Sequence, residues 1–265
     1  MSSSVPPPLK RFGQHFLIDP NIVRKIVDLA DIQPHETVLE IGPGRGILTR
    51  ALCAKAQKVI AIEIDRQLAQ ALAGEAPNLD LRIGDALEFD YGSLPQGTVV
   101  VANLPYYVST PLLFTLLESS QLIDRLILML QTEVAQRMTA RPGTKEYGAL
   151  SVQAQYRAAV TLAFRVSPHC FRPRPTVGSA VVLLRVKTTR SLDADREQWF
   201  VRLVRAAFAH RRKTVLNSLR DEGYAADSVA AALAACGIAT ERRAETLSLE
   251  DYLALAAALN DAGRV

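Results

Sequence analysis

Short apolar segments alternate with helix-like segments through the first half of the sequence, and this order constrains the fold more than any other feature. The apolar segments have the β-branched composition of strands. They lack a polar face, which is typical of parallel strands buried between two layers of helices. The sequence therefore predicts an α/β protein with a Rossmann-like, doubly wound, mostly parallel sheet. The expected parallel strands are 37–41, 58–62, 79–83, 98–101 and 125–130.

Two further apolar segments extend this sheet, and a change of composition then ends it. Residues 160–166 and 180–186 are expected to form an antiparallel hairpin on the edge of the sheet, which makes it seven-stranded. From residue 190 the chain is rich in alanine and has helical spacing but no strand signal. We therefore expect a disordered lead at 1–9, an α/β domain at 10–189 and a small all-α C-terminal domain at 190–265.

The composition is that of a globular protein. Of the 265 residues 49% are hydrophobic, yet no apolar run approaches the roughly 20 residues that a membrane helix needs. The N-terminal segment lacks the apolar core of a signal peptide, so we expect a cytoplasmic protein with no membrane partner. The cysteines, Cys53, Cys170 and Cys236, are far apart, which favours reduced thiols and no metal site. We expect a monomer, because no extra apolar stripe is evident.

The net charge of +4 conceals a strong segregation of charge along the chain. Residues 134–220 contain 17 Lys and Arg against 4 Asp and Glu, whereas the remainder contains 14 against 23. A basic middle on an acidic body indicates a face that binds a polyanion. Chance clustering on a solvated surface would give the same counts, but the surplus extends over three separate segments.

A glycine-rich turn follows the first predicted strand. Its spacing is Glu40-x-Gly42-x-Gly44-x-Gly46, which differs from both the dinucleotide fingerprint and the Walker loop. A strand, a glycine turn and a helix N-terminus together form a corner that binds anions or nucleotides. The negative charge of Glu40 would repel a pyrophosphate and attract a sulfonium or an amino group.

Acidic residues close the next two strands. Glu63 ends the second strand. In dinucleotide-binding folds, a carboxylate at this position accepts hydrogen bonds from both ribose hydroxyls. Asp85 ends the third strand, and its carboxylate can accept from an adenine amino group. Each acid alone could simply cap a strand, but their position beside the glycine turn predicts a site for a nucleoside cofactor.

A polar and aromatic loop, Asn103-Leu104-Pro105-Tyr106-Tyr107, follows the fourth strand. Asn, Pro and Tyr are common in ordinary turns. The same residues also suit a planar amine-bearing ring, because an aromatic ring can stack on it and an amide can accept from its amino group. A purine base would fit this loop.

Together these motifs resemble those of S-adenosylmethionine-dependent adenine-N6 methyltransferases that act on ribosomal RNA. Three further stretches are similar to parts of that family: 13–17 to its N-terminal cofactor lid, 171–179 to its Pro-rich insert and 208–214 to its basic helix. The similarity runs from about residue 10 to about residue 219 and is greatest to the bacterial small-subunit rRNA adenine dimethyltransferases. Members of that type dimethylate two adjacent adenosines in the hairpin loop near the 3′ end of the RNA.

The resemblance implies a cofactor, partners and site residues. The cofactor is S-adenosylmethionine, with S-adenosylhomocysteine as product, and the partners are small-subunit rRNA and the small ribosomal subunit or its precursor. The implied catalytic loop is Asn103, Leu104, Pro105 and Tyr106, with Tyr107, Phe12 and Phe171 as expected walls of the pocket. The implied cofactor contacts are His15, Leu17, Gly42, Glu63, Asp85 and Asn103. The expected RNA contacts are Arg137, Arg141, Lys145, Arg172, Arg174, Arg205, Arg211, Arg212 and Lys213.

One residue departs from the family pattern, and two alternatives for the function stay open. Many relatives have Asn where this chain has His15, so a contact by backbone would persist and one by a side-chain amide would not. A large-subunit rRNA adenine methyltransferase of the macrolide-resistance type would share the core, but the Pro-rich insert and the helix with Arg211, Arg212 and Lys213 argue against it. A ribosome-assembly factor that acts mainly by binding is the alternative from another class.

Overall fold

The computed structural model describes residues 14–105, 108–188 and 192–259. They form two compact units. The first contains the described residues up to Ala135 together with Ala159–Val186, and the second contains Gln136–Ala158 together with the described residues from Lys187 onward. Among the described residues, no helix combines the length and the apolar composition that crossing a bilayer requires.

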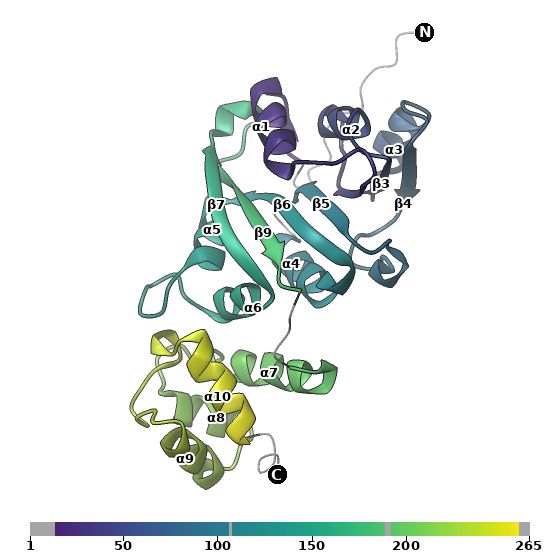
Figure 1. Cartoon of the computed structure of the whole chain (residues 1–265). Coiled ribbons are helices and arrows are strands. Elements are labelled where there is room, and N and C mark those ends of the chain that lie inside the picture. Colours follow the sequence, from purple (N-terminus) through teal and green to yellow (C-terminus); the bar gives the residue numbers. More distant parts are fainter. Residues whose placement is uncertain (1–13, 106–107, 189–191, 260–265) are drawn as a thin grey trace. The chain divides into compact units, whose positions relative to one another are not determined.

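The first unit is built on a seven-stranded sheet (Figure 1). The strand order is β4-β3-β2-β5-β6-β9-β7, and the neighbours from β4 to β6 are all parallel. This confirms the predicted doubly wound, mostly parallel sheet. The bounds are β2 Thr37–Ile41, β3 Lys58–Glu63, β4 Leu79–Ile83, β5 Thr98–Asn103, β6 Ile123–Gln131, β7 Ala158–Val166 and β9 Ser179–Val186.

The last strand of the sheet in sequence does not lie at its edge. β9 pairs antiparallel with β6, and β7 occupies the outer position beyond it. The burial of side chains explains this order, because the first four residues of β9 are fully buried whereas most of β7 is exposed or half-buried. The more apolar strand therefore takes the interior position, where both faces are covered.

Apolar side chains on both faces of the sheet are buried. On one face, residues of α1 and α2 pack against alternate residues of the central strands, such as Val38, Val99 and Ile127. The residues between these, including Leu39 and Val100, have no exposed area either. The helices of this unit are α1 Pro20–Ala30, α2 Ile47–Cys53, α3 Arg66–Leu72 and α4 Ser109–Glu118, with short turns η2 Tyr91–Ser93, η3 Ser120–Leu122 and η4 Pro168–Cys170, and α5 Thr132–Thr139 follows β6.

A second, two-stranded sheet joins segments that are far apart in the sequence. β1 Phe16–Leu17 pairs antiparallel with β8 Phe171–Arg172. The backbone N–H of Ile18 extends this ribbon by donating to the carbonyl of Cys170 at 2.8 Å. The sequence predicted no strand at residues 16–17, because two residues are too few to show a strand period.

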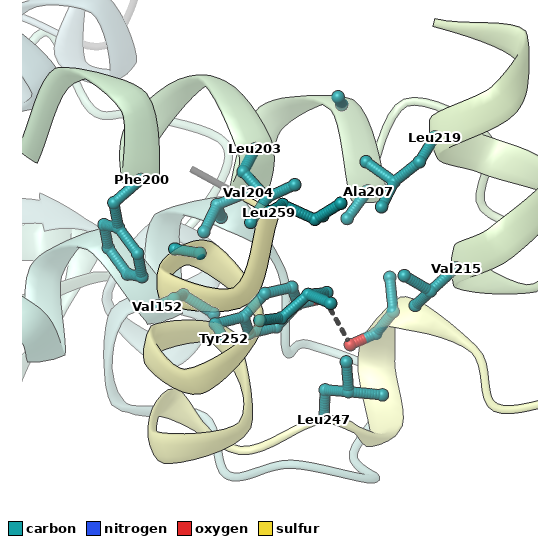
Figure 2. Close-up of a cluster of buried hydrophobic side chains, with 14 of the residues drawn as sticks. Val152, Phe200, Leu203, Val204, Ala207, Val215, Leu219, Leu247, Tyr252 and Leu259 are labelled. Atoms are coloured by element: carbon teal, nitrogen blue, oxygen red, sulfur yellow. Dashed lines mark hydrogen bonds between the residues drawn. The ribbon is translucent and has the colours of Figure 1, made fainter. Parts of the chain in front are cut away.

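In the described residues of the second unit, the regular structure is helical apart from the first residue of β7 and an isolated β-bridge between Thr214 and Arg243. Its helices are α6 Ala149–Arg157, α7 Ala194–Ala207, α8 Val215–Asp221, α9 Ala226–Ala235 and α10 Leu249–Leu259, with η5 Ala244–Thr246. Figure 2 shows Phe200, Leu203, Leu219 and Tyr252 meeting in one apolar core. The hydroxyl of Tyr252 donates to the carbonyl of Ala244 at 2.8 Å and so satisfies the polar atom of a side chain with no exposed area.

The segment before β7 belongs to this helical unit. Val152 and Tyr156 of α6 are part of its core. The guanidinium of Arg157 pairs with the carboxylate of Glu197 in α7 at 2.7 Å, and both side chains are at least 91% buried. A buried ion pair of this kind holds α6 and α7 in one geometry, because separating the two charges would break a close interaction between groups that are shielded from water.

Candidate active site

The loops that follow four of the strands lie at the same edge of the sheet. Ile41 of β2 pairs with Ile62 of β3 and with Ala102 of β5. Glu63 at the end of β3 pairs with Ile83 at the end of β4. Because parallel strands end at one edge, this register brings the glycine turn, Glu63, Asp85 and Asn103 to that edge. The structure thus gathers the residues that sequence reasoning had selected one by one.

The glycine turn is shaped by left-handed backbone conformations. Gly44 has a φ of 57° and Gly46 a φ of 75°. A Cβ on Gly44 would lie 3.1 Å from the ring of Phe16, and one on Gly46 would lie 2.3 Å from the side chain of Leu72. Only glycine combines this backbone with such close neighbours. The turn therefore presents bare backbone at the start of α2.

Glu63 connects β3 to the glycine turn. Its carboxylate accepts from the backbone N–H of Gly44 at 3.0 Å and from that of Asp65 at 2.9 Å. Burial raises the pKa of this carboxyl above its ordinary value, while the two N–H groups oppose the shift. Each carboxylate oxygen keeps a further lone pair, so Glu63 can still accept from a ligand hydroxyl.

Glu40 is a second buried carboxyl beneath the same turn. Its side chain is 1% exposed, and among the described residues its Oε2 atom has no hydrogen-bond partner. Burial, with a smaller contribution from the charge of Glu63, raises the pKa of Glu40 to about 8. A buried carboxyl without a compensating charge is suited to a cationic ligand, which would restore its ionised form.

Asp85 lies in a turn after β4, where its carboxylate accepts from the backbone N–H of Leu87 at 2.9 Å. Three apolar side chains near it are unusually exposed: Ile64 at 37%, Ile83 at 51% and Leu87 at 37%. Sequence reasoning missed these residues. Their signal was a large apolar residue directly at or after a strand end, where a polar turn residue is more usual. Such side chains suit the faces of a flat ring.

Asn103 is the last residue of β5, and its amide is already oriented. Its Nδ2 atom donates to the backbone carbonyl of His15 at 3.3 Å. The following Leu104 is 1% exposed and donates its backbone N–H to Met129 at 3.1 Å, and the carbonyl of Pro105 accepts from Val108 at 3.3 Å. The loop therefore leaves the sheet in a defined direction. Tyr106, Tyr107 and Phe12 lie outside the described residues.

The segment around β1 contacts three of these strand ends. Gln14 donates its side-chain N–H to the carboxylate of Asp65 at 3.2 Å, and His15 accepts from Asn103. The ring of Phe16 lies 4.5 Å from the guanidinium carbon of Arg45 in the glycine turn. Leu17 is 6% exposed and packs in the core of the first unit, so only its backbone could reach a ligand.

The expected RNA contacts are divided between the two units. Arg172 and Arg174 are exposed in the Pro-rich stretch of the first unit, and the other seven belong to the second. Within the second unit, Arg211 donates to the carbonyl of Lys145 at 2.8 Å, which attaches the basic loop at residues 141–145 to the segment between α7 and α8. Lys213 forms an ion pair with Asp221. Arg137 is half-buried, and the remaining basic side chains of this set are exposed.

The chain matches a described family over nearly its whole length. The family is "Ribosomal RNA adenine dimethylase", and its profile matches residues 9–261. A protein of Moorella thermoacetica named "Ribosomal RNA small subunit methyltransferase A" is 46% identical, with 95% of this chain and 92% of that protein covered. A protein of Thiobacillus denitrificans with the same name is also 46% identical, with coverage of 95% and 98%.

Two solved structures are similar over the same extent. A dimethyladenosine transferase from Plasmodium falciparum has a TM-score of 0.78 at 28% sequence identity, with 93% of this chain and 98% of the other covered. The 23S rRNA methyltransferase ErmE has a TM-score of 0.70 at 27% identity, with coverage of 93% and 100%.

Proposed function

Because the chain belongs to the ribosomal RNA adenine dimethylase family, we propose that it transfers methyl groups from S-adenosylmethionine to two adjacent adenosines in the 3′-terminal hairpin loop of small-subunit rRNA. The transfer to the N6 amines gives dimethyladenosines during ribosome biogenesis. The observation that carries this proposal is the position of Asn103 and Pro105 at the same sheet edge as the glycine turn and Glu63. A nucleoside cofactor and a target base can share that edge.

The residues at this edge fit S-adenosylmethionine. The uncompensated carboxyl of Glu40 suits a cationic ligand, and the exposed Ile64 and Leu87 beside Asp85 suit an adenine ring. Glu63 can accept from ribose hydroxyls through its remaining lone pairs. When bound, this cofactor supplies an electrophilic methyl group on a sulfonium. The residues proposed to hold it are His15, Leu17, Gly42, Glu63, Asp85 and Asn103.

The chain's contribution to the reaction is positioning. An adenine amino group is a weak nucleophile because its lone pair is delocalised into the ring. The Oδ1 atom of Asn103 and a carbonyl of the Leu104-Pro105 segment accept its hydrogens and favour a more nucleophilic, tetrahedral nitrogen. Tyr106 stacks on the base, which must leave its RNA stack to be reached. No strong base is required, because the methylated ammonium is acidic enough to lose its proton to water.

The basic residues are proposed to hold the RNA. Contacts from Arg and Lys to phosphates fix the position of an RNA without reading its sequence. We assign the methyl transfer to a domain at 10–189 and a large part of RNA binding to the helical domain at 190–265. Arg141 and Lys145, although earlier in the chain, contribute from within the helical unit. The small ribosomal subunit or its precursor is the proposed partner, in the cytoplasm, with the enzyme as a monomer.

Two observations bear on the large-subunit alternative. The similarity to ErmE supports it, since the two folds agree over 93% of this chain. The relatives with 46% identity, however, carry the name of a small-subunit methyltransferase. The deciding experiment incubates the enzyme with labelled S-adenosylmethionine and either small-subunit particles lacking the modification or naked large-subunit rRNA. Mass mapping should find dimethyladenosine only in the small-subunit RNA, and methylation of the large-subunit RNA alone would overturn the assignment.

A further inference from the structure

We propose that His15 is a positioning residue for Asn103: its ring is anchored to the Pro-rich stretch, and its backbone carbonyl orients the Asn103 amide so that Oδ1 faces the substrate amine. The inference rests on the proposed function for its consequence in catalysis. Its structural content is a chain of two hydrogen bonds, from the carbonyl of Pro173 through His15 to the side chain of Asn103.

The first bond anchors the ring. The Nδ1 atom of His15 lies 2.8 Å from the carbonyl oxygen of Pro173. A carbonyl can only accept, so Nδ1 must carry the proton of this bond. The neutral ring with its proton on Nδ1 and the cationic ring both satisfy this requirement. The adjacent pairing of Phe16 with Arg172 keeps the two segments in register, so the ring of His15 and the β1–β8 ladder hold the same stretch of backbone.

The second bond selects one orientation of the Asn103 amide. Its Nδ2 atom donates to the carbonyl of His15 at 3.3 Å, which directs Oδ1 to the other side of the amide carbon. A flipped amide would place two acceptor oxygens against each other and would present an NH₂ group to an amine that needs an acceptor. Only the orientation in the structure is productive for the proposed reaction. Any motion of the His15 carbonyl therefore changes the fraction of productive active sites.

The side chain of His15 is not needed to hold β1 in the fold. Phe16 is 7% exposed and Leu17 is 6% exposed, so both are anchored by burial on their own. Removing the imidazole should leave the β1–β8 pairing intact while the backbone at residue 15, which precedes the first paired residue, loses its anchor. The expected effect is on the turnover rate rather than on folding.

The kinetic test compares His15→Ala and His15→Asn with His169→Ala, an exposed histidine of η4 just before the Pro-rich stretch. At saturating S-adenosylmethionine and small-subunit particles, H15A should lower kcat by about ten- to a hundredfold, the range expected for a misplaced catalytic group. The KM for the cofactor should change by less than about threefold, because Leu17, Gly42, Glu63 and Asp85 keep their proposed contacts with the cofactor. H15N should restore most of kcat, since its amide can donate to Pro173, and H169A should match the wild type.

A second measurement does not depend on activity. The ¹⁵N NMR spectrum of the wild-type protein should show His15 with a proton on Nδ1, and the side-chain amide resonance of Asn103 should move in H15A but not in H169A. An Nδ1 without a proton in the wild type, or an unchanged Asn103 amide in H15A, would overturn the inference. An unchanged kcat in H15A, or an effect confined to the KM for the cofactor, would also overturn it.

If H15A does not fold, as judged by its thermal melting, H15N and the wild-type spectrum still decide the question. Wild-type protein with both hydrogen bonds but no methyl transfer would refute the proposed function instead.

Discussion

The carboxylate of Glu63 accepts the backbone N–H of Gly44 across 3.0 Å, so the end of β3 holds the glycine turn that follows β2. A second oxygen of the same carboxylate accepts from Asp65. One buried side chain therefore maintains the spacing between two loops of the proposed cofactor site. Its substitution should affect both the stability of that edge and the binding of a ligand.

Glu63→Ala should remove both hydrogen bonds and leave two N–H groups without their acceptor. Each buried unsatisfied donor costs about 1–3 kcal/mol, so the free energy of unfolding should fall by a few kcal/mol. Binding of S-adenosylhomocysteine, measured by titration calorimetry, should weaken at least about tenfold, as expected for the loss of about 1.4 kcal/mol of contacts. The exposed Glu88→Ala, from the same edge, serves as the control. An E63A protein that binds as tightly as the wild type would remove Glu63 from the site.

Asn103→Ala should bind small-subunit particles normally and transfer no detectable methyl group. The substitution removes the acceptor for the adenine amine but none of the basic side chains. Asn103→Asp should also be inactive, because its carboxylate cannot donate to the carbonyl of His15 and is repelled by it. Transfer of label and particle binding are measured in parallel. Retained transfer by N103A would contradict the mechanism, whereas loss of binding would point to a role in the RNA contact.

Glu40 should make stability depend on pH. Its carboxyl has a pKa of about 8 in the native protein against 4.5 for an ordinary glutamate. Between these values the native protein holds a proton that the unfolded chain releases, so this group makes the protein less stable as pH rises through that window. Glu40→Gln cannot titrate. The unfolding free energy of E40Q relative to wild type should therefore increase by up to about 1.4 kcal/mol per pH unit from pH 5 to 8.

The measurement is urea unfolding followed by circular dichroism at several pH values. Glu88→Gln is the matched control, since Glu88 is exposed and its substitution makes the same chemical change. Parallel stability curves for E40Q and wild type across this range would show that Glu40 is ionised in the native protein.

The Arg157–Glu197 pair should be critical to the helical unit. Glu197→Ala leaves the guanidinium of Arg157 buried at 3% exposure without its carboxylate. Removing one partner of a buried pair costs about 3–5 kcal/mol. Asp195→Ala, an exposed acid two residues earlier in α7, should cost about 0.5 kcal/mol or less. Trp199 is the chain's single tryptophan and lies in α7, so its fluorescence during urea unfolding reports on this unit. Equal midpoints for the two variants would contradict the expectation.

The basic residues should set the salt dependence of RNA binding. The double substitution Arg141→Ala and Arg212→Ala removes two exposed positive charges of the second unit. If each contacts one phosphate, the slope of log affinity against log salt should become less negative by about two, and binding should weaken. Arg24→Ala with Lys55→Ala removes the same charge from exposed positions outside the basic segment. Equal slopes for the two double variants would show that Arg141 and Arg212 do not contact the RNA phosphates.

The features that sequence reasoning predicted correctly are those with a local cause. The central parallel strands are mostly apolar runs of five or more residues, and a strand's turn carries its own signal, as in Glu40 to Gly46. Once the strands are known to be parallel, their ends must meet at one edge. The convergence of Gly42, Glu63, Asp85 and Asn103 at that edge follows from topology alone.

The features that it missed depend on contacts between distant residues. The donation from Asn103 to His15 joins positions 88 residues apart, and neither residue has a local pattern that reveals it. The packing of α6 against α7 also lacks a local pattern. It depends on the ion pair between Arg157 and Glu197, which are separated in the sequence by β7 and β9. Glu63 was correctly placed at the strand end, but its bond to Gly44 requires the folded turn.

The pairing of β1 with β8 also determines when a growing chain can complete its site. His15 leaves the ribosome early, yet Pro173, which anchors its ring, is synthesised 158 residues later. At the usual rate of about 5–20 residues per second, this interval is about 8–30 s. Until Pro173 is made, the His15 carbonyl that orients the Asn103 amide lacks its anchor. The nascent enzyme should therefore acquire its parallel strands first and its competence for methyl transfer only after the Pro-rich stretch has emerged.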